Sequence, residues 1–542
     1  MNRFSFHQRD RIWQQTPTAD GHRLDLKGHA YLDNQPTSAT TFTATLSTAH
    51  SADALIALLQ RMNGFYAWVE EAPGGVRAAV DHIRSYPLFY ALKNGDFFLS
   101  DDAEWVRQQA GDEEMDPIAR EEFLLAGYVT GSDTLFPIVK QLQAGECLIA
   151  HQTETGIRVD THRYYRFLHQ EPHTYSEPAL RAELEQVTIR AMQRLIEHAN
   201  SRQIVIPLSG GYDSRLIASM LKKLGYTNVL CFTYGVPGNT ESQYSKQVAD
   251  SLGFTWEFVE YSKELWRKEW NTSEAKAYRQ MASGHVSLPH VQDWLAVKKL
   301  VVEEKVDKDA IFVPGHSGDF VAGSHIPDFV FQKKRHTHRS LIDSLIANHL
   351  SNCPKRNMQL ADLSCLTERI VSRIEIPFDG SDIGFANLYE AWDCQERQAK
   401  YIVNSVRVYD QFAHEWWLPL WDLEFVRFWE AVPLALRQKR IWLKTWIQHQ
   451  YAEASGNCVS LQMGNAGDAR SASLLITAAK KIAPMLPDDL VALLKKLRQK
   501  KLYSNHFLAF EGLISDDQFI KYSSTGHNII GMYSDVQINE KW

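Results

Sequence analysis

Hydrophobic and polar positions follow two different patterns along the chain, and the patterns meet near residue 170. Up to about residue 165, apolar residues fall in short runs such as 65–69, 97–100 and 146–150, with Gly and Asp between them. Runs of this length bounded by turn residues are typical of β-strands. The first part of the chain therefore predicts a sheet-rich domain, and a polar linker follows it over residues 169–176.

From residue 177 the pattern changes to an alternation of helices and strands. It predicts a helix over about 177–200, a buried apolar strand over 204–208, a second helix over about 214–224 and another strand over 229–234. Strand, helix and strand at this spacing are typical of a parallel α/β sheet. Beyond about residue 335, amphipathic stretches predominate and predict a mainly helical region.

Length and composition narrow the class of protein. The 542 residues allow two to four domains of ~150 residues, and 44% hydrophobic with 23% charged residues is typical of a soluble globular protein. A net charge of −7 argues against a protein that mainly coats nucleic acid. No apolar run reaches ~18 residues and the start lacks a signal-peptide pattern, so we expect no membrane segment. Six cysteines without a CxxC pair favour reduced thiols and a cytoplasmic location.

Residues 208–214, which read LSGGYDS, carry the most specific chemistry. They lie between a predicted buried strand and a helix, where two glycines permit a tight turn and close approach to an anion. Hydroxyl groups and free N–H groups at a helix start are natural phosphate donors. An acid in such a loop repels phosphate unless it holds Mg²⁺, so Asp213 is a candidate metal ligand. The alternative is an ordinary strand-to-helix turn. The segment has neither the Walker nor the Rossmann glycine pattern.

This loop resembles the pyrophosphate loop of the N-type ATP pyrophosphatases, a group that includes asparagine synthetases and β-lactam synthetases. The resemblance implies that ATP is cleaved to AMP and pyrophosphate while a substrate carboxylate or carbonyl is adenylated. The positions that match the loop or lie where the family forms its adenine and ribose pocket are Leu208, Ser209, Gly210, Gly211, Asp213, Ser214, Phe232 and Gly315.

A second stretch, residues 313–323, is similar to the GEGSDExFGG segment of asparagine synthetases. The resemblance places Asp319 at the family's second Mg²⁺-binding acid. Two carboxylates from separate loops suit a cation that bridges pyrophosphate oxygens. The chain departs from the family pattern at His316 and Phe320, each of which replaces an acid.

A third stretch, residues 415–422, resembles the ExRxPFLD segment of asparagine synthetases, with Trp417 in place of Arg. Two positions that form a catalytic Tyr–Glu pair in β-lactam synthetases correspond here to His316 and Glu415. Such a carboxylate would orient the imidazole as a base for an attacking amine. A His in this motif is also similar to lasso-peptide cyclases. The alternative is that His316 only bonds its loop and Glu415 is a surface acid.

Two further features are candidates only because of where they fall in the sequence. Lys439 and Lys444 are candidates for a late lysine that the family uses near the adenylate. Seven of the 15 tryptophans fall between Trp392 and Trp446; most are expected in the core, but Trp416 and Trp417 are candidates for shaping an acceptor pocket.

The first part of the chain resembles the class II glutaminase domain through residues 64–67 (GFYA) and 81–90 (DHIRSYPLFY). The resemblance implies an Ntn-type αββα sandwich. Its nucleophile is an N-terminal Cys, but the second residue is Asn2 and the first cysteine is Cys147. We therefore expect no glutaminase activity from this domain.

These observations predict a degenerate glutaminase-like domain over 1–165, an ATP pyrophosphatase domain over 177–460 with a parallel sheet, and a helical tail over 461–542. The expected activity is that of an ATP- and Mg²⁺-dependent ligase that joins a small-molecule or peptide carboxylate to an amine or ammonia. The nitrogen source can include a separate glutaminase; neither nucleic acid nor a membrane is expected as a partner, and a homodimer is left open. The alternatives are a non-catalytic ATP-binding protein and a lasso-peptide or β-lactam type of cyclase.

Overall fold

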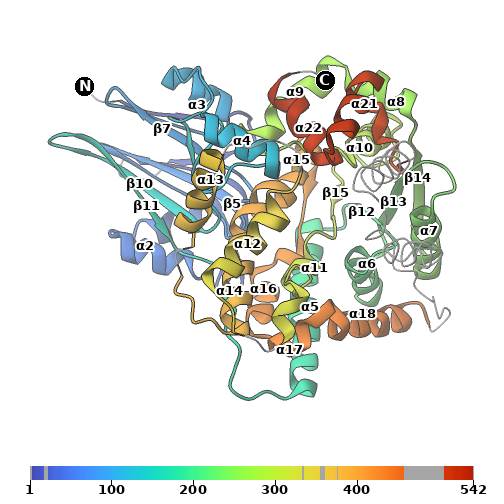
Figure 1. The fold of residues 1–542 in the computed structure, drawn as a ribbon. Coiled ribbons are helices and arrows are strands. Elements are labelled where there is room, and N and C mark those ends of the chain that lie inside the picture. The colour runs from blue at the N-terminus through green and yellow to red at the C-terminus, as the bar shows by residue number, and fades with distance from the viewer. Residues whose placement is uncertain are drawn as a thin grey trace.

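The computed structural model describes residues 3–17, 22–332, 335–353, 360–374, 376–456 and 506–540. The strands of the N-terminal half (blue) lie beside a second half (green to orange), and the C-terminal helices (red) lie near both (Figure 1). Within the described residues, no helix is both long enough and apolar enough to cross a membrane.

The N-terminal half contains two β-sheets. The larger is antiparallel and has the strand order β11-β10-β6-β5-β3-β2, with β4 paired to β3. The smaller has the order β1-β8-β7-β9, and in it β1 runs parallel to β8. The strands are β1 (Phe4–His7), β2 (Gln14–Pro17), β3 (Arg23–Leu32), β4 (Gln35–Thr37), β5 (Met62–Ala72), β6 (Gly75–Val80), β7 (Phe89–Lys93), β8 (Asp96–Ser100), β9 (Lys140–Gln141), β10 (Glu146–Thr153) and β11 (Gly156–Arg163).

Each of these sheets has one face against the other sheet and one face against helices. Val69 and Leu148 of the larger sheet share a buried apolar cluster with Phe97 and Leu99 of the smaller. Helices α1 and α2 pack on the outer face of the larger sheet, and α3 packs against β7 and β8 on that of the smaller, with α4 next along the chain. The layer order of helix, sheet, sheet and helix confirms the predicted αββα sandwich. These helices are α1 (Ala39–Leu46), α2 (Ala52–Leu59), α3 (Ala103–Ala110) and α4 (Pro117–Ala126).

The second half is built on a five-stranded sheet in which every pair is parallel, as predicted. Its order is β14-β13-β12-β15-β16. The strand β12 is a continuous apolar run because helices cover both faces of the sheet, and Ile204, Val205 and Ile206 are fully buried. The strands are β12 (Ile204–Pro207), β13 (Val229–Gly235), β14 (Thr255–Glu260), β15 (Ile311–Phe312) and β16 (Glu415–Trp416).

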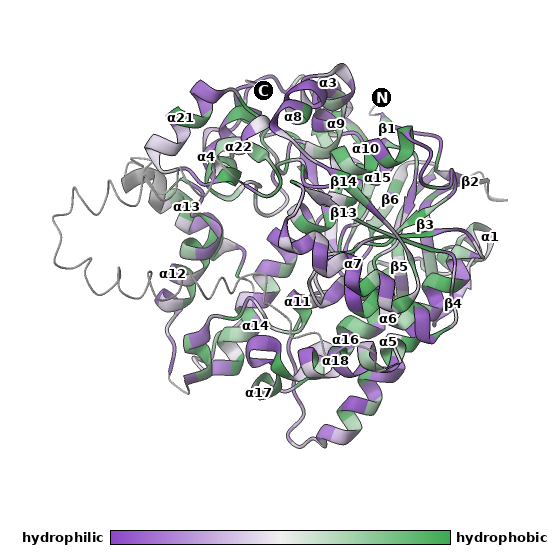
Figure 2. Cartoon of the chain, turned by 90° about the vertical axis from the view of Figure 1, so that its right-hand side faces the viewer, coloured by the Kyte–Doolittle hydropathy of each residue, from purple (hydrophilic) through white to green (hydrophobic). Residues whose placement is uncertain are grey.

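Helices of the second half bury one side against the rest of the protein. In Figure 2, α5 and α18 each carry both hydrophilic and hydrophobic residues, because one side of each helix is buried. Those that accompany the sheet are α5 (Glu177–Ala199), α6 (Asp213–Lys223), α7 (Thr240–Leu252), α8 (Lys263–Trp270), α9 (Ser273–Ser283), α10 (Trp294–Val302), α16 (Leu423–Ala431) and α18 (Ile441–Ala454).

The predicted helical region after residue 335 is also present. It contains α12 (His338–His349), α13 (Leu360–Ser372), α14 (Asp382–Asp393) and a π-helix over Cys394–Ile402. Of the predicted tail over 461–542, residues 461–505 lie outside the described part. The described end of the tail is helical, with α21 (Asp516–Thr525) and α22 (Ile529–Ile538), and α22 packs against α4 of the N-terminal half.

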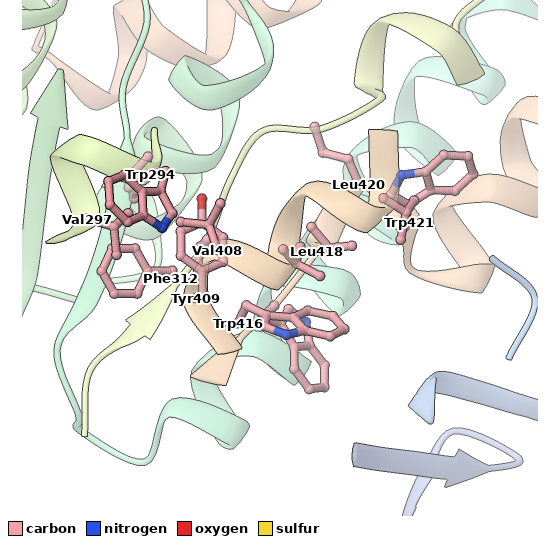
Figure 3. Packing of buried hydrophobic residues seen from close by; sticks show 14 of the residues in the cluster. Trp294, Val297, Phe312, Val408, Tyr409, Trp416, Leu418, Leu420 and Trp421 are labelled. Atoms are coloured by element: carbon pink, nitrogen blue, oxygen red, sulfur yellow. The ribbon is translucent and has the colours of Figure 1, made fainter. Parts of the chain in front are cut away.

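Tryptophans fill the interface between the two halves. Trp416 and Trp417, 3% and 1% exposed, both pack against Phe65 of β5, at centroid distances of 5.9 and 5.1 Å. Figure 3 shows Trp416, Leu418 and Trp421 among the buried residues around β15 and β16. Both rings are buried between the two halves, so the role of Trp416 and Trp417 in shaping an acceptor pocket stays a prediction.

Candidate functional site

Two neighbouring strands deliver the predicted phosphate-side residues to one place. The loop after β12 leads into α6 at Asp213, and the loop after β15 leads into the short helix α11 (Gly318–Val321). Because β12 and β15 are adjacent and parallel, their carboxyl ends meet at the same edge of the sheet. The backbone N–H of Asp319 donates to Oδ2 of Asp213 at 3.0 Å, so the structure brings the two acids together.

Glycines make this close approach of the two loops feasible. A Cβ at Gly315 would lie 2.6 Å from the backbone nitrogen of Ser214. A Cβ at Gly318 would lie 3.0 Å from Cγ of Asp213. A side chain at either position would therefore push the second loop away from the first.

A cavity of ≈ 490 Å³ opens beside the two loops. Six of its lining residues come from the segment 209–214, and Gly315, His316 and Asp319 come from the second loop. The cavity thus collects most of the residues that the two motifs predict. Other segments contribute residues that sequence reasoning missed or placed by position alone: Tyr234, His290, Gln292, Asp293, Arg440 and Lys444.

Not every predicted pocket residue reaches this cavity. Leu208 and Phe232 are 1% and 0% exposed in the hydrophobic core, and the N–H of Leu208 donates to the carbonyl of Phe232 at 2.8 Å. Neither lines the cavity, so their predicted place in the adenine and ribose pocket is not seen. Of the two lysines considered, Lys444 lines the cavity and Lys439 does not.

The two acids repel each other, and the repulsion shifts an ionisation equilibrium. Burial and then the negative charge of Asp319 raise the pKa of Asp213 to about 7. Nη1 of Arg440 lies 3.5 Å from Oδ1 of Asp213 and offsets part of that repulsion. A bound divalent cation would offset the remainder. Carboxylate and hydroxyl oxygens are the donors that Mg²⁺ prefers, so this set of residues fits that ion.

One backbone amide of the phosphate loop donates a hydrogen bond to a carboxylate oxygen. The backbone N–H of Gly210 donates to Oε2 of Glu241 at 2.6 Å, and Glu241 lies in the first turn of α7. The Ser209 hydroxyl accepts a bond from the N–H of Gly211 at 3.1 Å. The carboxylate of Glu241 thus occupies an amide position of the kind that binds phosphate oxygens in glycine-rich loops.

His316 lies on the cavity wall as a neutral base. Burial and the neighbouring His290 lower the pKa of His316 to about 4. The Ser405 hydroxyl lies 3.2 Å from its Nδ1, and the His290 ring centroid is 6.5 Å from its own. His290 is in turn held by Asp293, whose Oδ1 lies 3.1 Å from Nε2 of His290. The partners of His316 are therefore Ser405 and the His290–Asp293 pair.

Glu415 does not join His316, so the predicted pair is not formed. Glu415 begins β16 and lies opposite Ile311, the first residue of β15, whereas His316 follows the end of β15. In parallel strands, a strand start and the loop after a strand end lie at opposite edges of the sheet. Glu415 instead contacts His198 and Arg202, at 2.8 and 3.1 Å.

In the N-terminal half, no thiolate is available from Cys147. This residue lies in β10 and is fully buried. Burial raises the pKa of its thiol to about 12, so the thiol stays protonated at neutral pH.

Comparison with known proteins agrees with this site in part. The family model for asparagine synthase matches residues 183–279, which include Asp213 but not Asp319, His316 or Glu415. The matched segment contains the strand β12 and the loop 209–214 that follows it. No curated protein matches the chain.

Three solved structures are similar to parts of the chain. They are an allosteric regulatory enzyme of purine biosynthesis (12% identity, TM-score 0.17), a predicted tRNA methyltransferase subunit from Methanocaldococcus jannaschii (18%, 0.15) and glutamine phosphoribosylpyrophosphate amidotransferase from B. subtilis (12%, 0.18). The matches cover 56%, 31% and 56% of this chain, and 58%, 74% and 63% of those chains. The chain therefore spans less than two thirds of the first of these relatives.

Proposed function

We propose that this protein is an ATP-dependent carbon–nitrogen ligase of the asparagine synthetase type. In this reaction a carboxylate is adenylated, pyrophosphate leaves, and an amine or ammonia then displaces AMP. The observation that carries the proposal is the meeting of Asp213 and Asp319 beside the loop 209–214 in one cavity. The family match over 183–279 supports it.

The residues of the first loop would bind the phosphates of ATP. The N–H of Gly210 and the hydroxyls of Ser209 and Ser214 supply neutral donors, and Arg440 and Lys444 supply positive charge at the cavity wall. Asp213 and Asp319 would hold Mg²⁺, which supplies charge neutralisation for the phosphate oxygens when bound. A substrate carboxylate oxygen then bonds to the α-phosphorus as the bond to pyrophosphate breaks.

The second step needs a proton acceptor, and we assign that role to His316 because it lines the cavity beside the two acids. Its pKa of about 4 leaves the imidazole unprotonated at neutral pH, and Ser405 orients the ring. The amine nitrogen bonds to the acyl carbon, AMP leaves with its phosphate, and the nitrogen loses a proton to His316. In this scheme Ser405 and His290 take the orienting role that the sequence assigned to Glu415.

His316 also supports a second candidate function, that of an intramolecular cyclase. Its presence on the second motif is one of the features that distinguish this chain from asparagine synthetases. A substrate with its own amine, such as a peptide or a β-amino acid, would use the same adenylation step. A non-catalytic ATP-binding protein would bind ATP without either step.

Exchange of labelled pyrophosphate into ATP tests the proposal. We expect exchange that requires a carboxylic acid, and we expect Asp213→Asn to lower it by about a hundredfold or more because the phosphates lose their cation site. Asp250→Asn, which changes an exposed acid on α7, is the matched control and should exchange normally. Full exchange by Asp213→Asn would refute the metal assignment. Binding of ATP without exchange for any acid would favour the non-catalytic alternative.

A further inference from the structure

A cluster of two histidines and a carboxylate lies at the junction of the two halves, outside the cavity described above. His29 comes from β3 of the N-terminal half, His198 from α5, and Glu415 from β16. One potential ligand atom from each residue lies within 4.8 Å of the other two. The three residues are far apart in sequence, so only the docking of the two halves brings them together.

The spacing of the atoms suits a small transition-metal ion. Oε2 of Glu415 lies 2.8 Å from Nε2 of His198 and 3.8 Å from Nε2 of His29. In a tetrahedral site with bonds of about 2.0–2.1 Å, neighbouring ligand atoms are about 3.3–3.4 Å apart. These two separations bracket that value and the histidine nitrogens lie within 4.8 Å of each other, so side-chain movements would bring the three atoms to corners of a tetrahedron.

The nitrogen of His198 is available for a ligand. The side chain of His198 is only 7% exposed, yet its buried Nε2 makes no hydrogen bond of acceptable geometry although it lies close to Glu415. The Trp417 ring stacks on it at a centroid distance of 4.6 Å and fixes the plane of the imidazole. The contact with the Glu415 carboxylate is therefore an ion pair without regular hydrogen-bond geometry, and a metal ion between the two groups would replace it with coordination.

A positively charged residue orients the Glu415 carboxylate. Nη1 of Arg202 lies 3.1 Å from Oε1 of Glu415, which leaves Oε2 toward the histidines. Partners of this kind orient metal-binding carboxylates in known sites.

An ion can also reach the cluster from solvent. His29 and His198 line a cavity of ≈ 380 Å³, together with Tyr31 and Asn200. The side chains of His29 and Glu415 are about half exposed, at 43% and 50%. Water or a further ligand can therefore occupy the fourth corner.

We propose that His29, His198 and Glu415 form a binding site for a divalent transition-metal ion of the Zn²⁺ class, which joins the N-terminal half to the second half. The site is separate from the Asp213–Asp319 pair and differs from it in donor chemistry, because imidazole nitrogen favours Zn²⁺ over Mg²⁺. The proposal does not depend on the adenylation reaction.

Metal binding by the full chain tests the proposal. Equilibrium dialysis with Zn²⁺ should give about one bound ion per chain, and Co²⁺ should give the visible absorption of a tetrahedral nitrogen–oxygen site. Zn²⁺ should raise the unfolding temperature because it binds only where the two halves are docked. His29→Ala and Glu415→Gln should each weaken Zn²⁺ binding by about tenfold or more. Glu415→Gln keeps the size of the side chain, so loss of folding would not explain its effect.

Two control variants separate this site from others. His151→Ala removes an exposed histidine of β10 and should leave Zn²⁺ binding unchanged. Asp213→Asn should also leave it unchanged. The proposal is overturned if the unaltered chain binds no Zn²⁺, if His29→Ala and Glu415→Gln bind it normally, or if Asp213→Asn alone removes it.

Discussion

At the scale of single residues, the Asp213 carboxyl links the chemistry of the cavity to the stability of the fold. Its pKa in the folded protein is raised to about 7 by burial and by Asp319, whereas an aspartate in an unfolded chain titrates near 3.9. Between these values the folded state holds a proton that the unfolded state has released. The free energy of unfolding therefore falls as the pH rises through this window and stays lower above pH 7.

Replacing Asp213 with Asn removes this pH-dependent penalty. Without divalent cations at pH 8, we expect Asp213→Asn to be more stable than the unaltered protein by ~1–3 kcal/mol, and the difference to vanish near pH 4. Asn can still accept the N–H of Asp319, so that contact is kept. Denaturant unfolding in EDTA at both pH values measures the effect. A variant with unchanged stability at pH 8 would show that burial and Asp319 do not raise the pKa of Asp213 in the folded protein.

Sequence patterns found the residues of the site only where the chemistry is local. Ser209, Gly210 and Asp213 follow one another between a buried strand and a helix, so their spacing alone predicts a phosphate loop. His290 and Arg440 come from distant segments with no motif around them, and only the folded chain places them on the same cavity. No local signal in the sequence marks either residue.

At the scale of elements, the sequence predicts where helices and strands lie but not at which end of the sheet a residue is placed. The predicted helix over about 177–200 and strand over 204–208 match α5 (Glu177–Ala199) and β12 (Ile204–Pro207) within a residue, because apolar periodicity is a local property. The His316–Glu415 pair failed because two motifs can belong to adjacent strands and still lie at opposite edges of the sheet. Spacing along the chain does not specify which edge a residue faces.

The contact between the two loops predicts the effect of a single methyl group. Gly315→Ala places a Cβ 2.6 Å from the backbone nitrogen of Ser214, so the loops must separate. We expect ATP–pyrophosphate exchange to fall by about tenfold or more, since catalytic geometry tolerates little displacement. We also expect a loss of ~1–3 kcal/mol in the free energy of unfolding.

Gly74→Ala is the control for that change. Gly74 lies in the turn between β5 and β6 at a φ of +81°, and a Cβ there meets no atom within 4 Å. Its substitution strains the backbone but leaves the loops in place, so stability should fall while exchange per folded molecule is retained. Equal losses of exchange in the two variants would show that the effect of Gly315→Ala is general destabilisation.

At the scale of the whole molecule, the N-terminal half supports the segment that underlies the site. The side-chain amide of Asn63 on β5 donates to both carboxylate oxygens of Asp422 at 3.2 Å and accepts the N–H of Leu423 at 3.0 Å. Two residues earlier, Leu420 packs against the second loop, because a Cβ at Gly318 would lie 2.7 Å from its Cδ1. A continuous set of contacts therefore runs from β5 through residues 420–423 to the loop that carries Asp319.

If this support positions the site, Asn63→Ala changes activity as well as stability. The buried Asp422 carboxylate and the N–H of Leu423 would lose partners, which costs ~1–3 kcal/mol in the free energy of unfolding. We expect exchange per folded molecule to fall several-fold because residues 420–423 are no longer held against the loop. Asn271→Ala, at the exposed end of α8, is the matched control and should change neither quantity. Asn63→Ala with full exchange at a temperature where it remains folded would show that the N-terminal half stabilises the second half without positioning its site.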